Sequence, residues 1–181
     1  AVRKKRQQAL ALTDELLQST FLDMFGDPVT NPKGWETELI GNCVSRLTNG
    51  YVGPTRAIYK DKGIPYLLAR HVHNNELKFD EKTFISNEFN QKHRKSMLRT
   101  GDILLVQSGH IGESAVVPSR HEGHNCHAMI VITPIPSKGT AQFLSHLFQQ
   151  FDRVGYWNRI KTGITVPHLN CRDVKKIMIP V

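Results

Sequence analysis

The hydrophobic positions divide the chain into a helical opening segment and a longer segment of short apolar runs. In residues 1–25, Leu10, Leu17, Phe21 and Met24 recur at steps of seven, four and three residues. This spacing places them on one side of an α-helix, so it predicts one amphipathic helix. Basic residues at positions 3–6 occupy the end where a helix dipole favours anions, so we expect the helix to begin before this chain does.

A dense run of helix breakers follows the predicted helix. Gly26-Asp27-Pro28 comes first, and Asn31-Pro32-Lys33-Gly34 follows closely. Glycine ends helices readily and proline cannot continue them, so the run predicts a turn-rich linker. We place the boundary there, with a helix and linker over residues 1–35 and a globular domain over residues 36–181.

The globular segment combines short strands with one strong helix. Apolar runs rich in Val, Ile and Leu predict strands over residues 66–69, 103–107, 114–117, 128–133 and 176–179. Phe143, Leu147 and Phe151 recur at four-residue steps and predict a helix over 140–152. Asn170 is expected to cap a short terminal helix, with Asp173 at its third position. The pattern therefore predicts an α+β fold.

Composition and charge narrow the function. The 181 residues carry 24 Lys and Arg against 16 Asp and Glu, a net charge of +8. Residues 36–181 hold most of the surplus (nineteen basic against twelve acidic, +7), which favours a polyanionic partner. Three widely spaced cysteines indicate a reduced, cytoplasmic protein rather than a disulfide scaffold. No apolar run is long enough to cross a membrane, and no signal sequence opens the chain.

The spacing of the polar residues gives little support for a catalytic site. The histidine- and cysteine-rich segment at 121–127, with His71 and His73 upstream, does not follow a zinc-binding spacing. Asp61 with Glu76-Leu77-Lys78 is a weak nuclease-like match that fits a solvated turn and strand end better. No nucleophile elbow, phosphate loop or cofactor-binding glycine loop is present. We therefore predict no catalytic residue, no metal and no cofactor.

Nucleic-acid binding is the chemistry that the loop residues support best. Basic and amide side chains gather in long polar connections, which on a small sheet commonly carry function. Lys and Arg neutralise phosphate, and Arg, Asn and Gln can pair with base edges, although each residue alone also fits a solvated loop. Trp35 and Trp157 are expected in the core. The residues predicted to bind DNA are Arg56, Lys60, Arg70, His71, His73, Asn74, Gln107, Ser108, His110, Arg120, His124, Asn125, Lys161 and Thr162.

An ordered series of segments adds to this interpretation. The series consists of residues 3–28 ending in Phe-Gly-Asp-Pro, Lys33-Gly34-Trp35, Gly63-Ile64-Pro65-Tyr66-Leu67, Gly101-Asp102-Ile103-Leu104 with Ser108-Gly109-His110-Ile111-Gly112, and Lys161 to Asn170 followed by Ile177-Met178-Ile179-Pro180. Together these segments resemble the specificity subunits of Type I restriction–modification systems. The resemblance covers nearly the whole chain, as one target recognition domain preceded by the end of a conserved spacer helix.

The resemblance implies both a fold and a role. It implies a mixed domain with a curved, mostly antiparallel sheet and a few short helices. Such subunits are not enzymes: each recognition domain reads one half of a split double-stranded DNA site, and the subunit binds methyltransferase (modification) subunits and a restriction subunit. The spacer helices would pair through Leu10, Leu17, Phe21 and Met24.

The family pattern is incomplete here, because there is one recognition domain rather than two and no second spacer helix follows it. Two interpretations stay open, a piece of a two-domain subunit and a half-size subunit that forms a homodimer through its spacer helices. The alternatives outside this family are a nuclease or methyltransferase acting alone and a helix-mediated protein adaptor.

Overall fold

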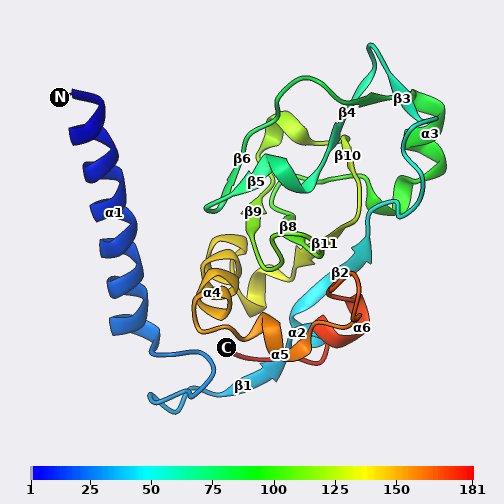
Figure 1. The fold of residues 1–181 in the computed structure, drawn as a ribbon. Coiled ribbons are helices and arrows are strands. Elements are labelled where there is room, and N and C mark those ends of the chain that lie inside the picture. Colours follow the sequence, from blue (N-terminus) through cyan, green and yellow to red (C-terminus); the bar gives the residue numbers. More distant parts are fainter. Residues whose placement is uncertain (1) are drawn as a thin grey trace.

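The chain begins with one long helix that lies at the side of the rest. In the computed structural model, which describes residues 2–181, helix α1 runs from Val2 to Phe25, as the spacing predicted. A turn ends it, in which the Asp27 carboxylate accepts a hydrogen bond from the Val29 amide at 2.7 Å. Figure 1 shows α1 standing apart from the sheets, on the side of helix α4 (Ala141–Arg153).

A four-stranded antiparallel sheet forms the centre of the fold. Its strands lie in the order β2 (Val44–Asn49), β11 (Met129–Pro134), β8 (Ile103–Val106) and β9 (Ser114–Val116). All four residues of β8 are fully buried, and they alternate between a core on one face of the sheet and a core on the other. A sheet buried on both faces needs continuous apolar runs, which is what β8 and β11 supply.

Helices cover the first face of the central sheet. Helix α4 begins at Thr140, whose hydroxyl accepts a hydrogen bond from the Phe143 amide at 3.1 Å, and its apolar side packs against β8 and β11. The short helices α2 (Ile40–Cys43), α5 (Trp157–Ile160) and α6 (Cys171–Val174) complete this layer. Trp157 is buried within it, as predicted.

A layer of short strands and turns covers the second face. A second sheet has the order β10 (Asn125–Cys126), β4 (Ile64–Leu67), β7 (Phe84–Ile85) and β3 (Tyr59–Lys60), and only the β10–β4 pair is parallel. Helix α3 (Asn87–Lys92) lies beside β3, and strands β5 (Val72–His73) and β6 (Glu76–Leu77) form a separate hairpin. 3₁₀ turns at 69–71, 94–96 and 119–121 join these elements, and another, at 136–138, lies between β11 and α4.

The two ends of the globular segment pair with each other. Strand β1 (Thr37–Leu39) runs antiparallel to β12 (Met178–Pro180), with Thr37 opposite Pro180. This pairing brings the start of the segment after the linker next to its last residues, close to where α1 ends. No helix in residues 2–181 has the length and hydropathy needed to cross a membrane.

The structure confirms the α+β class and the mostly antiparallel pairing, and it changes several details. The strands are divided among separate sheets instead of one, and β4 begins two residues before the predicted start at Tyr66. Strand β2 and helix α3 were not predicted, because their sequences are mostly polar. Trp35 is wrongly predicted as core: 44% of its surface is exposed, and its indole nitrogen donates to the Phe25 carbonyl at 3.0 Å.

A buried charge pair joins the edge of the central sheet to the second layer. Asp102, fully buried, pairs with the Arg46 guanidinium and accepts a hydrogen bond from the Thr133 hydroxyl. Its carboxylate also accepts the Arg99 amide at 2.7 Å, and Arg46 donates to the Met97 carbonyl at 2.8 Å. The pair thereby fixes the bend through which the chain enters β8.

We expect Asp102→Ala to lower the free energy of unfolding by about 3–5 kcal/mol, because it leaves the Arg46 cation without its counter-charge. The double variant Asp102→Leu with Arg46→Met should lose much less, since it removes both charges. Urea unfolding followed by circular dichroism measures both. Equal losses in the two variants would contradict an electrostatic role for the pair.

Candidate nucleic-acid interface

A tight hairpin presents two asparagines at one corner of the second layer. Asn74 and Asn75 connect β5 to β6 with φ angles of 49° and 59°, so both central residues of the turn are left-handed. Asparagine is one of the few residues that accept this conformation, which a type I′ turn requires twice. The sequence Asn-Asn is therefore the local cause of this hairpin, and it leaves His73 and Asn74 exposed at the tip.

The turn between β8 and β9 lies beside this hairpin. Nε2 of His110 donates a hydrogen bond to the Ala69 carbonyl at 3.1 Å, and the His110 ring stacks on that of His73 with 5.1 Å between the ring centroids. Gly112 ends the turn with a φ of 99°, and a Cβ there would meet the Trp157 ring at 2.2 Å. The turn can approach the helical layer this closely only because residue 112 is glycine.

A third loop closes the same corner. The Thr162 and His168 main chains exchange hydrogen bonds of 2.9 and 2.8 Å, and the Leu169 amide donates to the Gln107 carbonyl at 2.8 Å. An open groove of about 520 Å³ lies between this loop and the β8–β9 turn. The groove is lined by Gly109, His110, Ile111, Glu113, Asp152, Asn158, Lys161, Thr165, Val166 and Pro167.

We call the surface formed by residues 72–77, 107–113 and 161–168 the loop face. Five of the predicted DNA-binding residues have exposed side chains there: His73, Asn74, His110, Lys161 and Thr162. Ser108 lies within it, half-buried, in a bridge to His168. Because the middle segment is tied to the first by the hydrogen bond from the Asn74 amide to Glu113 and to the third by the Ser108–His168 bridge, the loop face is a single surface rather than a set of independent loops.

Four other predicted residues lie outside the loop face. Arg70 pairs with Asp80 at 3.0 Å, and Arg120 donates to the Leu77 carbonyl at 3.2 Å, although both side chains remain exposed. Arg56 and Lys60 are exposed, and strand β3, which contains Lys60, lies next to α3 at the far end of the second layer. Lys60 shares a shallow pocket there with Lys92, the last residue of α3.

Three of the predicted DNA-binding residues have structural positions instead. The His71 ring is buried, with one nitrogen 2.9 Å from the Asp80 carboxylate and the other accepting the Leu68 amide. Asn125 is fully buried and its amide donates to Asn90 at 3.0 Å. Gln107 is also buried. Their burial does not fit the predicted contact with DNA, because sequence position in a polar loop does not reveal which side chain turns inward.

The predicted histidine-rich segment forms a buried pair. His124 is half-buried, and its Nδ1 lies 3.1 Å from Nδ1 of His121, while Nε2 of His121 is buried and has no hydrogen-bond partner among the described residues 2–181. Burial, together with the nearby His124 and Arg120, lowers the pKa of His121 to about 4. Burial also lowers the pKa of His124 and of His71. Within residues 2–181 no three His, Cys, Asp or Glu side chains converge as metal ligands would.

Glu113 is a residue at this corner that the sequence did not single out. Glu113 accepts the Asn74 amide at 2.9 Å and lies 3.7 Å from His73. Asp152 also lines the groove, and desolvation together with the Glu113 charge raises its pKa. The consecutive asparagines were a usable signal for the turn, but nothing in the sequence indicated that Glu113 would meet it.

The predicted helix interface divides into a free part and a covered part. Leu10, Leu17 and Met24 are 53–59% exposed on α1. Phe21 is buried instead, with its ring stacked 5.9 Å from that of Phe143 on α4. Its side chain therefore anchors α1 to the globular segment and is not part of the free stripe.

Solved structures with the same arrangement come from Type I restriction–modification systems. A chain from the structural study of complex assembly and conformational transition in the type I R-M system superposes with a TM-score of 0.68 at 18% identity, over 99% of this chain and 42% of that chain. The HsdS subunit from Thermoanaerobacter tengcongensis gives a TM-score of 0.62 at 18% identity, over 99% and 41%. The S subunit from M. genitalium gives 0.52 at 15%, over 82% and 34%.

The chain therefore has the fold of Type I restriction–modification S subunits, as the resemblance of the sequence segments predicted. It spans about two fifths of the length of the first two structures it matches. The sequence itself matches no family profile and no curated protein.

Gly112→Ala tests how the loop face is attached to the helical layer. We expect it to lower the free energy of unfolding by about 2–4 kcal/mol, because the new methyl group meets Trp157 and the backbone is left-handed. Gly109→Ala is a matched control: φ is 80° there but the space is open, so the cost should be about 1–2 kcal/mol. Urea unfolding compares the two, and equal costs would contradict the steric explanation.

The buried histidines predict that the folded state loses stability in acid. Their pKa values are lower in the folded chain than the ordinary 6.5, so stability is complete above about pH 6.5 and decreases as pH falls toward 4. His121→Phe removes the strongest of these groups and should recover about 1–2 kcal/mol of the loss at pH 4.5. Unfolding free energies at pH 7.5 and 4.5 measure the effect, and an unchanged difference between them would refute it.

Proposed function

We propose that the chain is a sequence-reading subunit that recognises one half of a split double-stranded DNA site. The observation that carries this proposal is the loop face, where three tied loops present imidazole, amide and ammonium groups together. Such groups contact phosphates and the edges of bases. The positive charge of the globular segment adds a long-range attraction for a duplex.

The chain is proposed to act without catalysis of its own. A subunit that recognises a DNA sequence needs a rigid support and a surface of fixed shape. The core on both faces of the central sheet supplies the support, and the loops joined by hydrogen bonds supply the surface. Methylation and cleavage would be carried out by partner methyltransferase and restriction subunits, in the cytoplasm, as in the systems whose S subunits share this fold. The three cysteines are free thiols, which suits a reducing compartment.

Helix α1 is proposed as one half of a spacer. Its exposed apolar residues, Leu10, Leu17 and Met24, fit pairing with a second helix, from the same longer subunit or from a second copy. The distance between two half-sites would then depend on the helix length, since a helix rises 1.5 Å per residue. The exposed apolar residues of α1 also favour a second candidate function, that of a protein adaptor. In this function α1 would bind a partner protein, and the loop face would not bind DNA.

Salt dependence of DNA binding tests the proposal. We expect a duplex selected from a random pool to bind with an affinity that falls steeply as salt rises, because phosphate contacts release counterions. A triple variant should bind about 10–100-fold more weakly near 0.1 M salt, with a shallower salt slope. It changes to alanine Lys161 on the loop face and the two arginines that flank the β5–β6 hairpin, Arg70 and Arg120. Fluorescence anisotropy measures both quantities.

The matched control removes the same charge elsewhere. Arg172, Lys175 and Lys176 are exposed around α6, beside α2 and β2, and changing them to alanine should reduce affinity much less. Equal losses of affinity in the two triple variants would show that the duplex is attracted by the net charge of the chain alone. Binding that ignores salt, or cleavage or methylation by the isolated chain, would contradict the proposed function.

A further inference from the structure

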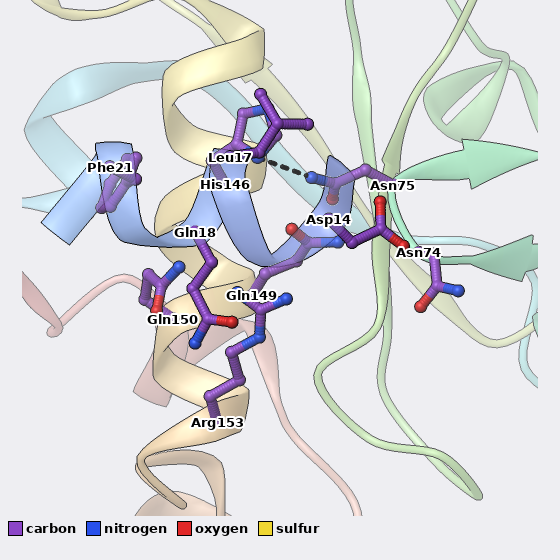
Figure 2. A pocket seen from close by; sticks show the side chains of 10 residues that line it. All are labelled: Asp14, Leu17, Gln18, Phe21, Asn74, Asn75, His146, Gln149, Gln150 and Arg153. Atoms are coloured by element: carbon purple, nitrogen blue, oxygen red, sulfur yellow. Dashed lines mark hydrogen bonds between the residues drawn. The ribbon is translucent and has the colours of Figure 1, made fainter. Parts of the chain in front are cut away.

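The tip of the β5–β6 hairpin contains two asparagines with opposite surroundings. The Asn75 side chain is half-buried and turned toward the body of the protein, whereas the Asn74 side chain is exposed. Figure 2 shows the Asn75 amide directed at His146, and the Asn74 amide directed away from that contact. Neighbouring residues of one turn therefore have different tasks.

Asn75 is held by the scaffold at three points. Its carbonyl oxygen accepts hydrogen bonds from the Ser145 hydroxyl at 2.8 Å and the Ser114 hydroxyl at 3.3 Å. Its amide nitrogen lies 3.1 Å from Nδ1 of His146. Ser114 and Ser145 are buried and in contact with each other at 3.1 Å, so the hairpin tip is fastened to both β9 and α4.

Asn74 is fixed by its main chain and free at its side chain. Its backbone amide donates to the Glu113 carboxylate at 2.9 Å, which ties the tip to the neighbouring β8–β9 turn. Within residues 2–181 its side-chain amide has no hydrogen-bond partner, and the side chain is exposed at the edge of a small cavity that Asp14 of α1 also lines. An exposed carboxamide on an immobile backbone is a preorganised donor–acceptor pair.

We propose that Asn74 is a specificity-determining residue that reads an adenine in the major groove, and that Asn75 is its positioning residue. This inference rests on the proposed function. A carboxamide matches adenine with two hydrogen bonds, accepting from N6 and donating to N7. Asn75 contributes by holding the turn still, because an amide on a mobile tip would lose part of its binding energy in becoming ordered.

Glycine substitutions separate the two roles without breaking the turn. Asn74→Gly and Asn75→Gly both tolerate positive φ, so each should keep the hairpin while deleting one side chain. Asn31→Gly is the matched control: Asn31 also has positive φ and uses its side chain in hydrogen bonds to the Trp35 main chain, but it lies in the linker. Thermal unfolding of all three checks that they remain folded.

The readout is discrimination at single positions of a duplex selected with the wild-type protein. We expect one adenine whose replacement by 7-deazaadenine, which lacks the N7 acceptor, weakens wild-type binding by about tenfold. Asn74→Gly should bind both duplexes equally. Asn75→Gly should lose most of the same discrimination although Asn74 is still present, and Asn31→Gly should keep it.

Each outcome has a definite meaning. If wild type discriminates and Asn74→Gly discriminates equally well, Asn74 does not read adenine and the inference fails while the proposed function stands. If Asn75→Gly keeps the full discrimination, its positioning role is refuted. If wild-type protein binds no duplex, the proposed function itself is overturned, and the inference with it.

Discussion

The fold depends on burying two neighbouring strands on both of their faces. Along β8, Ile103 and Leu105 face the core under α4, while Leu104 and Val106 face the core under the short strands. Strand β11 divides its residues in the same way. Neither face can be left open, because each would expose a row of large apolar side chains to water. One face is covered by helices, and the other by the layer of turns from which the loop face is built.

The loop face has one defined arrangement because hydrogen bonds hold it in place where the apolar core ends. Near the hairpin, the hydroxyls of Ser114 and Ser145 are buried and satisfied by Asn75 and by each other. A buried polar group without a partner is costly, so such a network favours one arrangement of the tip over its neighbours. On the other side, the contact of Gly112 with Trp157 sets the position of the adjoining turn.

Helix α1 is joined to the globular segment through aromatic rings near its end. Phe21 and Phe25 contact Phe143 on α4, at 5.9 and 5.0 Å between ring centroids, and Trp35 covers Phe25 from the linker. A small cavity follows toward the middle of α1, where Asp14 and Leu17 come near the hairpin tip (Figure 2). Helix α1 and the hairpin that presents Asn74 therefore share the same support on α4, which would couple the direction of the helix to the position of the loop face.

The sequence by itself determined the elements whose signal is local. The period of apolar residues located α1 and α4, the continuous apolar runs located β8 and β11, and Asn170 capped α6 as expected, through a hydrogen bond from the Asp173 amide. These features need only near neighbours in the chain. The order of short motifs was also sufficient to indicate the fold of Type I restriction–modification S subunits.

Only the tertiary structure decided which polar side chains face outward. His71, Asn125 and Gln107 looked equivalent to His73, Asn74 and His110, yet the first three are buried and the last three are exposed. The two-residue strands, the support of the hairpin by α4, and the meeting of Glu113 with Asn74 all join residues far apart in the sequence. Such contacts depend on how two layers pack around the central sheet, and no local pattern of residues encodes that packing.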